Sequence, residues 1–105
     1  MSPPQIFHLA TPDEWAAAQA RGSVEPPSLA AEGFVHCSVE DQLDDTIARH
    51  FDGVDDLVLL RLHADGVADA LRWEEGRPGE DFPHVYRAIR LDEVAEAIPW
   101  HRADG

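Results

Sequence analysis

The chain has 105 residues, 44% of them hydrophobic, which predicts a single domain (residues 1–105) with a modest buried core. Its 8 Lys and Arg face 21 Asp and Glu, so the formal net charge is -13 at pH 7. This charge repels the phosphates of nucleic acids and of anionic membranes, and no apolar run approaches the ~20 residues of a membrane span, so neither a nucleic acid nor a membrane is expected as a partner.

The first third of the chain predicts a strand, a helix and a loop. Residues 5–10 alternate as a strand does, with His8 near the middle. The following residues 11–14 (TPDE) supply an N-cap, a proline at the first helical position and a capping box, and Gly22 ends the helix. Residues 23–32 contain two consecutive prolines and predict an irregular loop that closes with a helical turn.

The segment Gly33–Ser38 predicts the strand around which a polar site would be organised. Its apolar and polar residues alternate, so Phe34, His36 and Ser38 should share one face. Ser38 should also cap the following helix, whose apolar residues recur every four positions as far as Phe51.

The second half of the chain predicts mainly strands. The most apolar one should be central, a polar loop is expected at 76–81 and a helical turn at 91–94, and the tail 102–105 should fray. Because helices come early and strands mostly late, the pattern favours an α+β domain, with its core at about 4–101, over a parallel βαβ sheet. The predicted strands are 57–63, 71–75, 84–90 and 95–100.

Three histidines lie in apolar strand segments that are far apart in the sequence: His8, His36 and His84. A lone strand histidine is more often a hydrogen-bonded structural residue, but three of them favour one shared polar pocket. A neutral imidazole both donates and accepts hydrogen bonds, which suits a ribose hydroxyl or a carboxamide, and it is the usual proton carrier near neutral pH. We therefore expect His8 to bind a ligand and His36 and His84 to be catalytic.

Five further residues complete the predicted site. Phe34, Ser38, Trp73 and Tyr86 are expected to contact the ligand, and Glu74 is expected to be a catalytic carboxylate because it lies in a strand. Trp73 and Glu74 point to opposite faces, so one of them should face the core. Structural alternatives remain open: a helix cap for Ser38, a half-buried aromatic for Tyr86 and a solvated strand face for Glu74.

Cys37 is the single cysteine and is adjacent to His36. Neighbouring side chains of a strand point apart, so Cys37 should be a small buried hydrophobe and not a nucleophile. A zinc site made of the three histidines is a weaker alternative; no HxH, HExxH or CxxC spacing supports it, and no metal is expected. With one cysteine and no basic segment followed by an apolar run at the N-terminus, a cytoplasmic location is expected.

Several short blocks of the sequence match the pattern of one known family. They are IFHLAT with a following Trp, PPSLAAEGFVHCS, LVLL, RWE and DFPHVY. In this order they resemble the family called domain of unknown function 952, over nearly the whole chain. The resemblance implies an ADP-ribosyltransferase-like fold, a strongly bent and mostly antiparallel β-sandwich with two main flanking helices.

The same resemblance implies a ligand. His8 matches the residue that binds the nicotinamide-side ribose of NAD in the wider superfamily, and His36 and Ser38 match residues of a second ligand-binding strand. A histidine at both places is similar to RNA 2′-phosphotransferases. The implied function is binding of a small nucleotide-like ligand, with NAD as a substrate, and ADP-ribosyl or phosphoryl-type transfer.

The chain departs from the superfamily pattern at its third position, a late-strand glutamate. The late strands offer His84, Tyr86 or Glu96 there, and none lies in a recognisable catalytic motif. The basic residues that hold RNA phosphates also have no clear counterpart. The alternative function is therefore a non-catalytic module that binds a small molecule or a protein, and the oligomeric state is left open.

Overall fold

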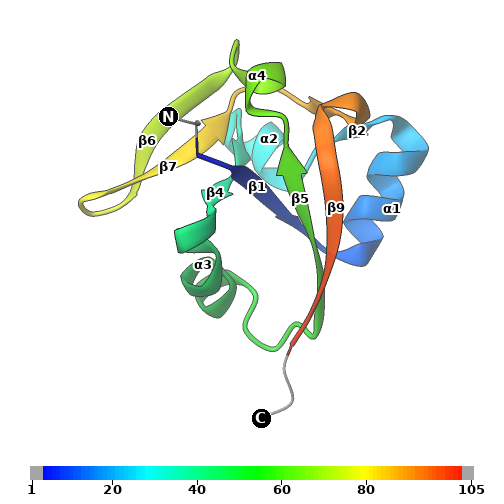
Figure 1. Cartoon of the computed structure of the whole chain (residues 1–105), viewed down its shortest axis with the longest axis horizontal. Helices are drawn as coiled ribbons and strands as arrows, with labels where there is room; N and C mark the ends of the chain where they lie inside the picture. Colours follow the sequence, from blue (N-terminus) through cyan, green and yellow to red (C-terminus); the bar gives the residue numbers. More distant parts are fainter. Residues whose placement is uncertain (1–3, 103–105) are drawn as a thin grey trace.

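The computed structural model describes residues 4–102, and the strands of this part form three antiparallel sheets (Figure 1). The strands are β1 Ile6–Ala10, β2 Ser23–Val24, β3 Val35–His36, β4 Ser38–Val39, β5 Asp56–Leu62, β6 Leu71–Arg77, β7 Glu80–Val85, β8 Ile89–Arg90 and β9 Val94–His101. The helices are α1 Pro12–Arg21, α2 Pro27–Glu32, α3 Leu43–His50 and α4 Ala64–Val67, with 3₁₀ turns η1 Glu40–Gln42 and η2 Leu91–Glu93.

The four-stranded sheet has the order β4-β1-β5-β9, the three-stranded sheet has the order β3-β7-β6, and β2 pairs with β8. The prediction of an α+β fold with mostly antiparallel strands is confirmed, and the predicted central strand is β5, between β1 and β9. In Figure 1, the β6–β7 hairpin lies at the left of the view and α1 at the right, with β1, β5 and β9 between them.

The local signals at the start of α1 act as expected. Glu14 N donates to Thr11 Oγ1 at 3.1 Å and Thr11 N donates to Glu14 Oε1 at 2.9 Å, which completes the capping box. Gly22 ends the helix in the left-handed conformation, with φ of 98°. The predicted loop 23–32 contains β2, and its predicted helical turn is α2.

Alternate residues of β1 face two apolar cores. Ile6 and Ala10 pack into one core together with residues of α1, β3 and β7. Phe7 and Leu9 pack into the other, which α3 closes. His8 lies between Ile6 and Ala10, so the pleat of β1 places it on the side of the sheet where β3 and β7 lie.

The predicted strand 33–38 is divided between two sheets. Val35–His36 pair with β7, whereas Ser38–Val39 pair with β1. Cys37 lies at the division, and its backbone N–H donates to the carbonyl of Pro83 at 3.0 Å. The two-residue strands therefore join the three-stranded sheet to the four-stranded sheet, and they bring His36 directly opposite His84.

Two predictions for the second half were wrong. The expected loop 76–81 is mostly strand, because β6 extends to Arg77, β7 begins at Glu80, and only Pro78-Gly79 connects them. The expected strand 84–90 is interrupted after Val85 and resumes at Ile89. Long-range contacts replace strand pairing at the interruption: the N–H of Tyr86 donates to the carbonyl of Ala70 at 2.9 Å, and the Arg87 guanidinium binds several carboxylate and carbonyl oxygens.

The helix expected from Ser38 begins later, as η1 at Glu40. Ser38 is a strand residue and does not cap it; the side chain of Gln42 accepts the N–H of Val39 instead, at 3.0 Å. The expected fraying tail 102–105 falls mostly outside the described residues, but Arg102 is held by the carbonyls of Phe51 and Val54. None of the helices in residues 4–102 has the length and hydropathy of a membrane span.

Candidate functional site

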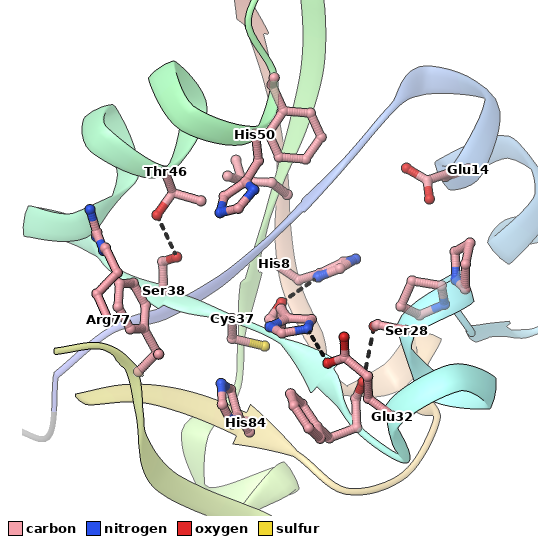
Figure 2. A pocket seen from close by; sticks show the side chains of 18 of the residues that line it. His8, Glu14, Ser28, Glu32, Cys37, Ser38, Thr46, His50, Arg77 and His84 are labelled. Atoms are coloured by element: carbon pink, nitrogen blue, oxygen red, sulfur yellow. Dashed lines mark hydrogen bonds and ion pairs between the residues drawn. The ribbon is translucent and has the colours of Figure 1, made fainter. Parts of the chain in front are cut away.

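A hollow of about 640 Å³ opens where the two larger sheets part, and residues of β1, β3, β4, β6 and β7 line it together with α1, α2 and α3. His8, His36 and His84, from three different strands, all line this hollow, which we call the histidine pocket. Figure 2 shows Thr46 and His50 reaching into it from α3, with His84 pointing toward it from the opposite side.

His8 is buried, with 6% of its surface exposed, and its Nδ1 lies 2.8 Å from the carbonyl oxygen of His36. A carbonyl only accepts hydrogen bonds, so Nδ1 carries the proton and Nε2 keeps its lone pair. Burial lowers the pKa of His8, which favours the neutral ring.

The Nε2 atom of His8 has no hydrogen-bond partner among the described residues, yet this part of the chain contains no fully buried polar side-chain atom that lacks one. The atom is therefore not fully buried, and His8 lines both the histidine pocket and a smaller hollow beside Glu14. Figure 2 shows the ring directed toward the side of the pocket where Glu14 lies.

His84 is also buried, and its Nδ1 lies 2.9 Å from Glu74 Oε1. The hydroxyl of Tyr86 donates to the same carboxylate oxygen at 2.5 Å. The Tyr86 hydroxyl and then the His84 ring lower the pKa of Glu74, while the carboxylate raises the pKa of Tyr86. Because the carboxylate accepts, Nδ1 of His84 donates to it. Nε2 has no hydrogen-bond partner among the described residues and is not fully buried, and the residue lines the pocket.

Glu74 and Tyr86 are therefore placed differently from the sequence expectation. Neither lines the histidine pocket; both lie behind His84 and act on the pocket through its imidazole. Trp73 is 44% exposed and does not line the pocket, and the Glu74 side chain is 37% exposed. Neither residue faces the core, although one of the two was expected to. The reason is that β6 is an edge strand with solvent on much of its surface.

The aromatic rings at the pocket form one cluster. Phe34 lies face to face with His84, with ring centroids 4.1 Å apart and planes at 19°, and edge-on to His36 at 4.7 Å. His36 Nε2 is 2.7 Å from Glu32 Oε2, and its side chain is 54% exposed, which places it at the rim. Phe34 thus holds the two imidazoles of β3 and β7 in place.

Ser38 and Cys37 line the pocket from its inner side. Ser38 Oγ is 3.4 Å from Thr46 Oγ1 of α3, and both hydroxyls can rotate toward a ligand. Cys37 is 4% exposed, and burial strongly raises the pKa of its thiol, which confirms the prediction of a small buried hydrophobe.

Several pocket residues were missed from the sequence. His50 lies four residues after Thr46 on α3, a spacing that puts both on one helix face, so this signal was available. Arg77 was hidden because its segment, 76–81, was predicted to be a loop, and Glu75 was passed over as the last residue of the strand predicted at 71–75. Glu96, a candidate late-strand carboxylate, pairs with Arg61 at 3.3 Å and does not line the pocket.

Within residues 4–102, no three or more His, Cys, Asp or Glu side chains are grouped so that they could hold a metal ion. The weaker alternative of a histidine metal site has no geometric support in this part of the chain. The three strand histidines instead bind a carbonyl, Glu32 and Glu74.

Comparison with known proteins identifies relatives over most of the chain. The family model described as protein of unknown function (DUF952) matches residues 9–97. A crystal structure of protein CC0527 from Caulobacter crescentus is similar over 90% of this chain and 84% of that chain, with 36% sequence identity and a TM-score of 0.84. A solution NMR structure of CC0527 matches with 37% identity and a TM-score of 0.77, over 89% of this chain and 81% of that chain. No curated protein matches the sequence.

Proposed function

The chain belongs to the DUF952 family, and we propose that it binds a small nucleotide-like ligand of the NAD or ADP-ribose type in the histidine pocket. The observation that carries the proposal is the pair of buried imidazoles, His8 and His84. Each ring lines the pocket and has its Nδ1 fixed by a protein acceptor, which leaves Nε2 of the neutral ring as a hydrogen-bond acceptor for a ligand.

Two fixed acceptors favour a ligand that presents two donors. The vicinal hydroxyls of a ribose are such donors, and a carboxamide N–H₂ is another. A pocket of about 640 Å³ lies within the range of roughly 300–1,000 Å³ that small-molecule sites occupy. The resemblance of His8, His36 and Ser38 to the NAD-binding residues of ADP-ribosyltransferase-like proteins supports the same ligand class.

A second candidate function, group transfer, is favoured by the chain of hydrogen bonds Tyr86–Glu74–His84. A carboxylate on Nδ1 orients an imidazole and stabilises the imidazolium that forms when Nε2 takes a proton. In ADP-ribosyl transfer, the bond between ribose C1′ and nicotinamide breaks and nicotinamide leaves with the electron pair. The oxygen of an acceptor hydroxyl bonds to C1′, and His84 takes its proton.

Titration calorimetry tests the binding proposal. NAD or ADP-ribose at millimolar concentration should bind the wild type, and His8→Asn and His84→Asn should each weaken binding about fivefold, as expected for a lost hydrogen bond of about 1 kcal/mol. Asparagine can keep the donor on the Nδ1 side while it removes the Nε2 acceptor, so the pocket is disturbed little.

The matched control is His101→Asn, because Nδ1 of His101 also binds a carboxylate, that of Asp56, but outside the pocket. This variant should bind like the wild type. The proposal is lost if neither ligand binds, or if the two pocket variants bind like the wild type. Release of nicotinamide from NAD would separate group transfer from a module that only binds.

A further inference from the structure

The histidine pocket carries an excess of negative charge. Three carboxylates line it, those of Glu14, Glu32 and Glu75, against the single guanidinium of Arg77 among the described lining residues. Arg77 is already paired with the carboxylates of Asp45 and Glu80. Among the lining residues that the structure describes, no arginine or lysine is therefore left unpaired for a phosphate.

The buried polar atoms of the pocket are also wrong for an anion. In the neutral ring, Nε2 of His8 and Nε2 of His84 are acceptors in side chains that are 6% and 5% exposed, and an acceptor repels the oxygens of a phosphate. A neutral hydroxyl or a cation satisfies them instead. These two atoms point to a ligand independently of the carboxylates.

The start of helix α2 offers the pocket few donors for an anion. Helix α2 begins there with Pro26 and Pro27, which have no N–H to offer to a phosphate. The hydroxyl of Ser28 is also occupied, because it donates to the carbonyl of Phe34 at 2.9 Å. This helix start therefore offers a phosphate fewer donors than a start without prolines would.

From these observations, and on the basis of the proposed function, we propose that the histidine pocket selects a cationic ribonucleoside without phosphate, namely an N-ribosylated pyridinium. Its ribose hydroxyls donate to Nε2 of His8 and of His84, and its positive ring lies among the carboxylates. A larger dinucleotide enters with this end, and its phosphates stay outside the pocket.

The test compares nicotinamide riboside, nicotinamide mononucleotide and NAD by titration calorimetry on the full chain. The riboside should bind about tenfold or more tightly than the mononucleotide, because the added phosphate meets the pocket carboxylates. The ratio should shrink in high salt, which screens charges at a partly open site.

Glu75→Gln and Glu32→Gln keep the side-chain shape, remove one pocket charge each, and should reduce the ratio severalfold. Glu96→Gln, outside the pocket, is the matched control and should leave it unchanged. A mononucleotide or NAD that binds as tightly as the riboside, or more tightly, overturns the charge selectivity but keeps the proposed function. If none of the three binds, both proposals fail.

Discussion

The surroundings of His8 determine what a ligand meets in the pocket. Its ring is buried, its Nδ1–H donates to the carbonyl of His36, and burial is the main cause of its lowered pKa. A ring in this state is a neutral acceptor at physiological pH. This hydrogen bond also joins β1 to β3. The same contact therefore fixes two strands of the pocket relative to each other and determines which nitrogen of His8 carries the proton.

His8 should make stability depend on pH in a defined window. The unfolded chain binds a proton on His8 near pH 6.5, and the folded chain does so only at lower pH, so folding loses stability as pH falls from about 6.5 through the folded pKa. Urea unfolding between neutral and mildly acidic pH should show this loss, and His8→Asn should reduce it while His101→Asn should not. An NMR titration in which His8 protonates at or above pH 6.5 would contradict the neutral acceptor.

Tyr86 reports on the contacts behind His84, since it is the single tyrosine of the chain. The Glu74 carboxylate raises its pKa above the usual 10. Glu74→Gln should return the pKa of Tyr86 toward 10, as followed by the absorbance of the tyrosinate. Glu75→Gln, one residue along β6, should leave it unchanged. Equal titration of Tyr86 in the wild type and in Glu74→Gln would mean that the Tyr86–Glu74 bond is absent in solution.

Some elements of the fold are determined by neighbouring residues in the sequence, and others by contacts with residues far away in the sequence. Helix α1 could be predicted because Thr11 and Glu14 cap it within four residues. The break in the strand expected at 84–90 could not, because it depends on Arg87 reaching Asp69 and Glu93, which are 18 and 6 residues away. A pairing of this kind has no signature in a short window of sequence.

The β6–β7 hairpin contains a glycine with a specific packing role. A Cβ at Gly76 would lie 2.6 Å from Cδ1 of Phe82, which is too close. Gly76→Ala should therefore lower the free energy of unfolding by about 1–3 kcal/mol, as overpacking does, in urea denaturation.

The matched substitution is Gly66→Ala in α4, where the nearest atom to a new Cβ is Cγ of Glu93 at 3.5 Å, an ordinary contact. It should hold or raise stability, because alanine favours a helix over glycine by roughly 1 kcal/mol. If Gly76→Ala is as stable as the wild type, the close packing of Phe82 on β6 is wrong.

At the scale of the molecule, the histidine pocket forms because the strands on either side of Cys37 belong to different sheets: β3 pairs with β7, and β4 pairs with β1. The three strand histidines could be named from the sequence, since each interrupts an apolar segment. The positions of Glu74 and Tyr86 behind His84 could not, because they follow from the pairing of β6 with β7 and from the bend after Val85. The acidic character of the pocket likewise appears only when α1, α2 and β6 are brought together.

The most direct test follows the imidazole signals by NMR while NAD is added to the full chain. We predict that the signals of His8, His36 and His84 move with one common dissociation constant, while those of His63 and His101, which do not line the pocket, stay in place. Saturable binding that leaves the three pocket signals unmoved, or no response at millimolar NAD, would contradict the proposal that these histidines form a nucleotide-type binding site.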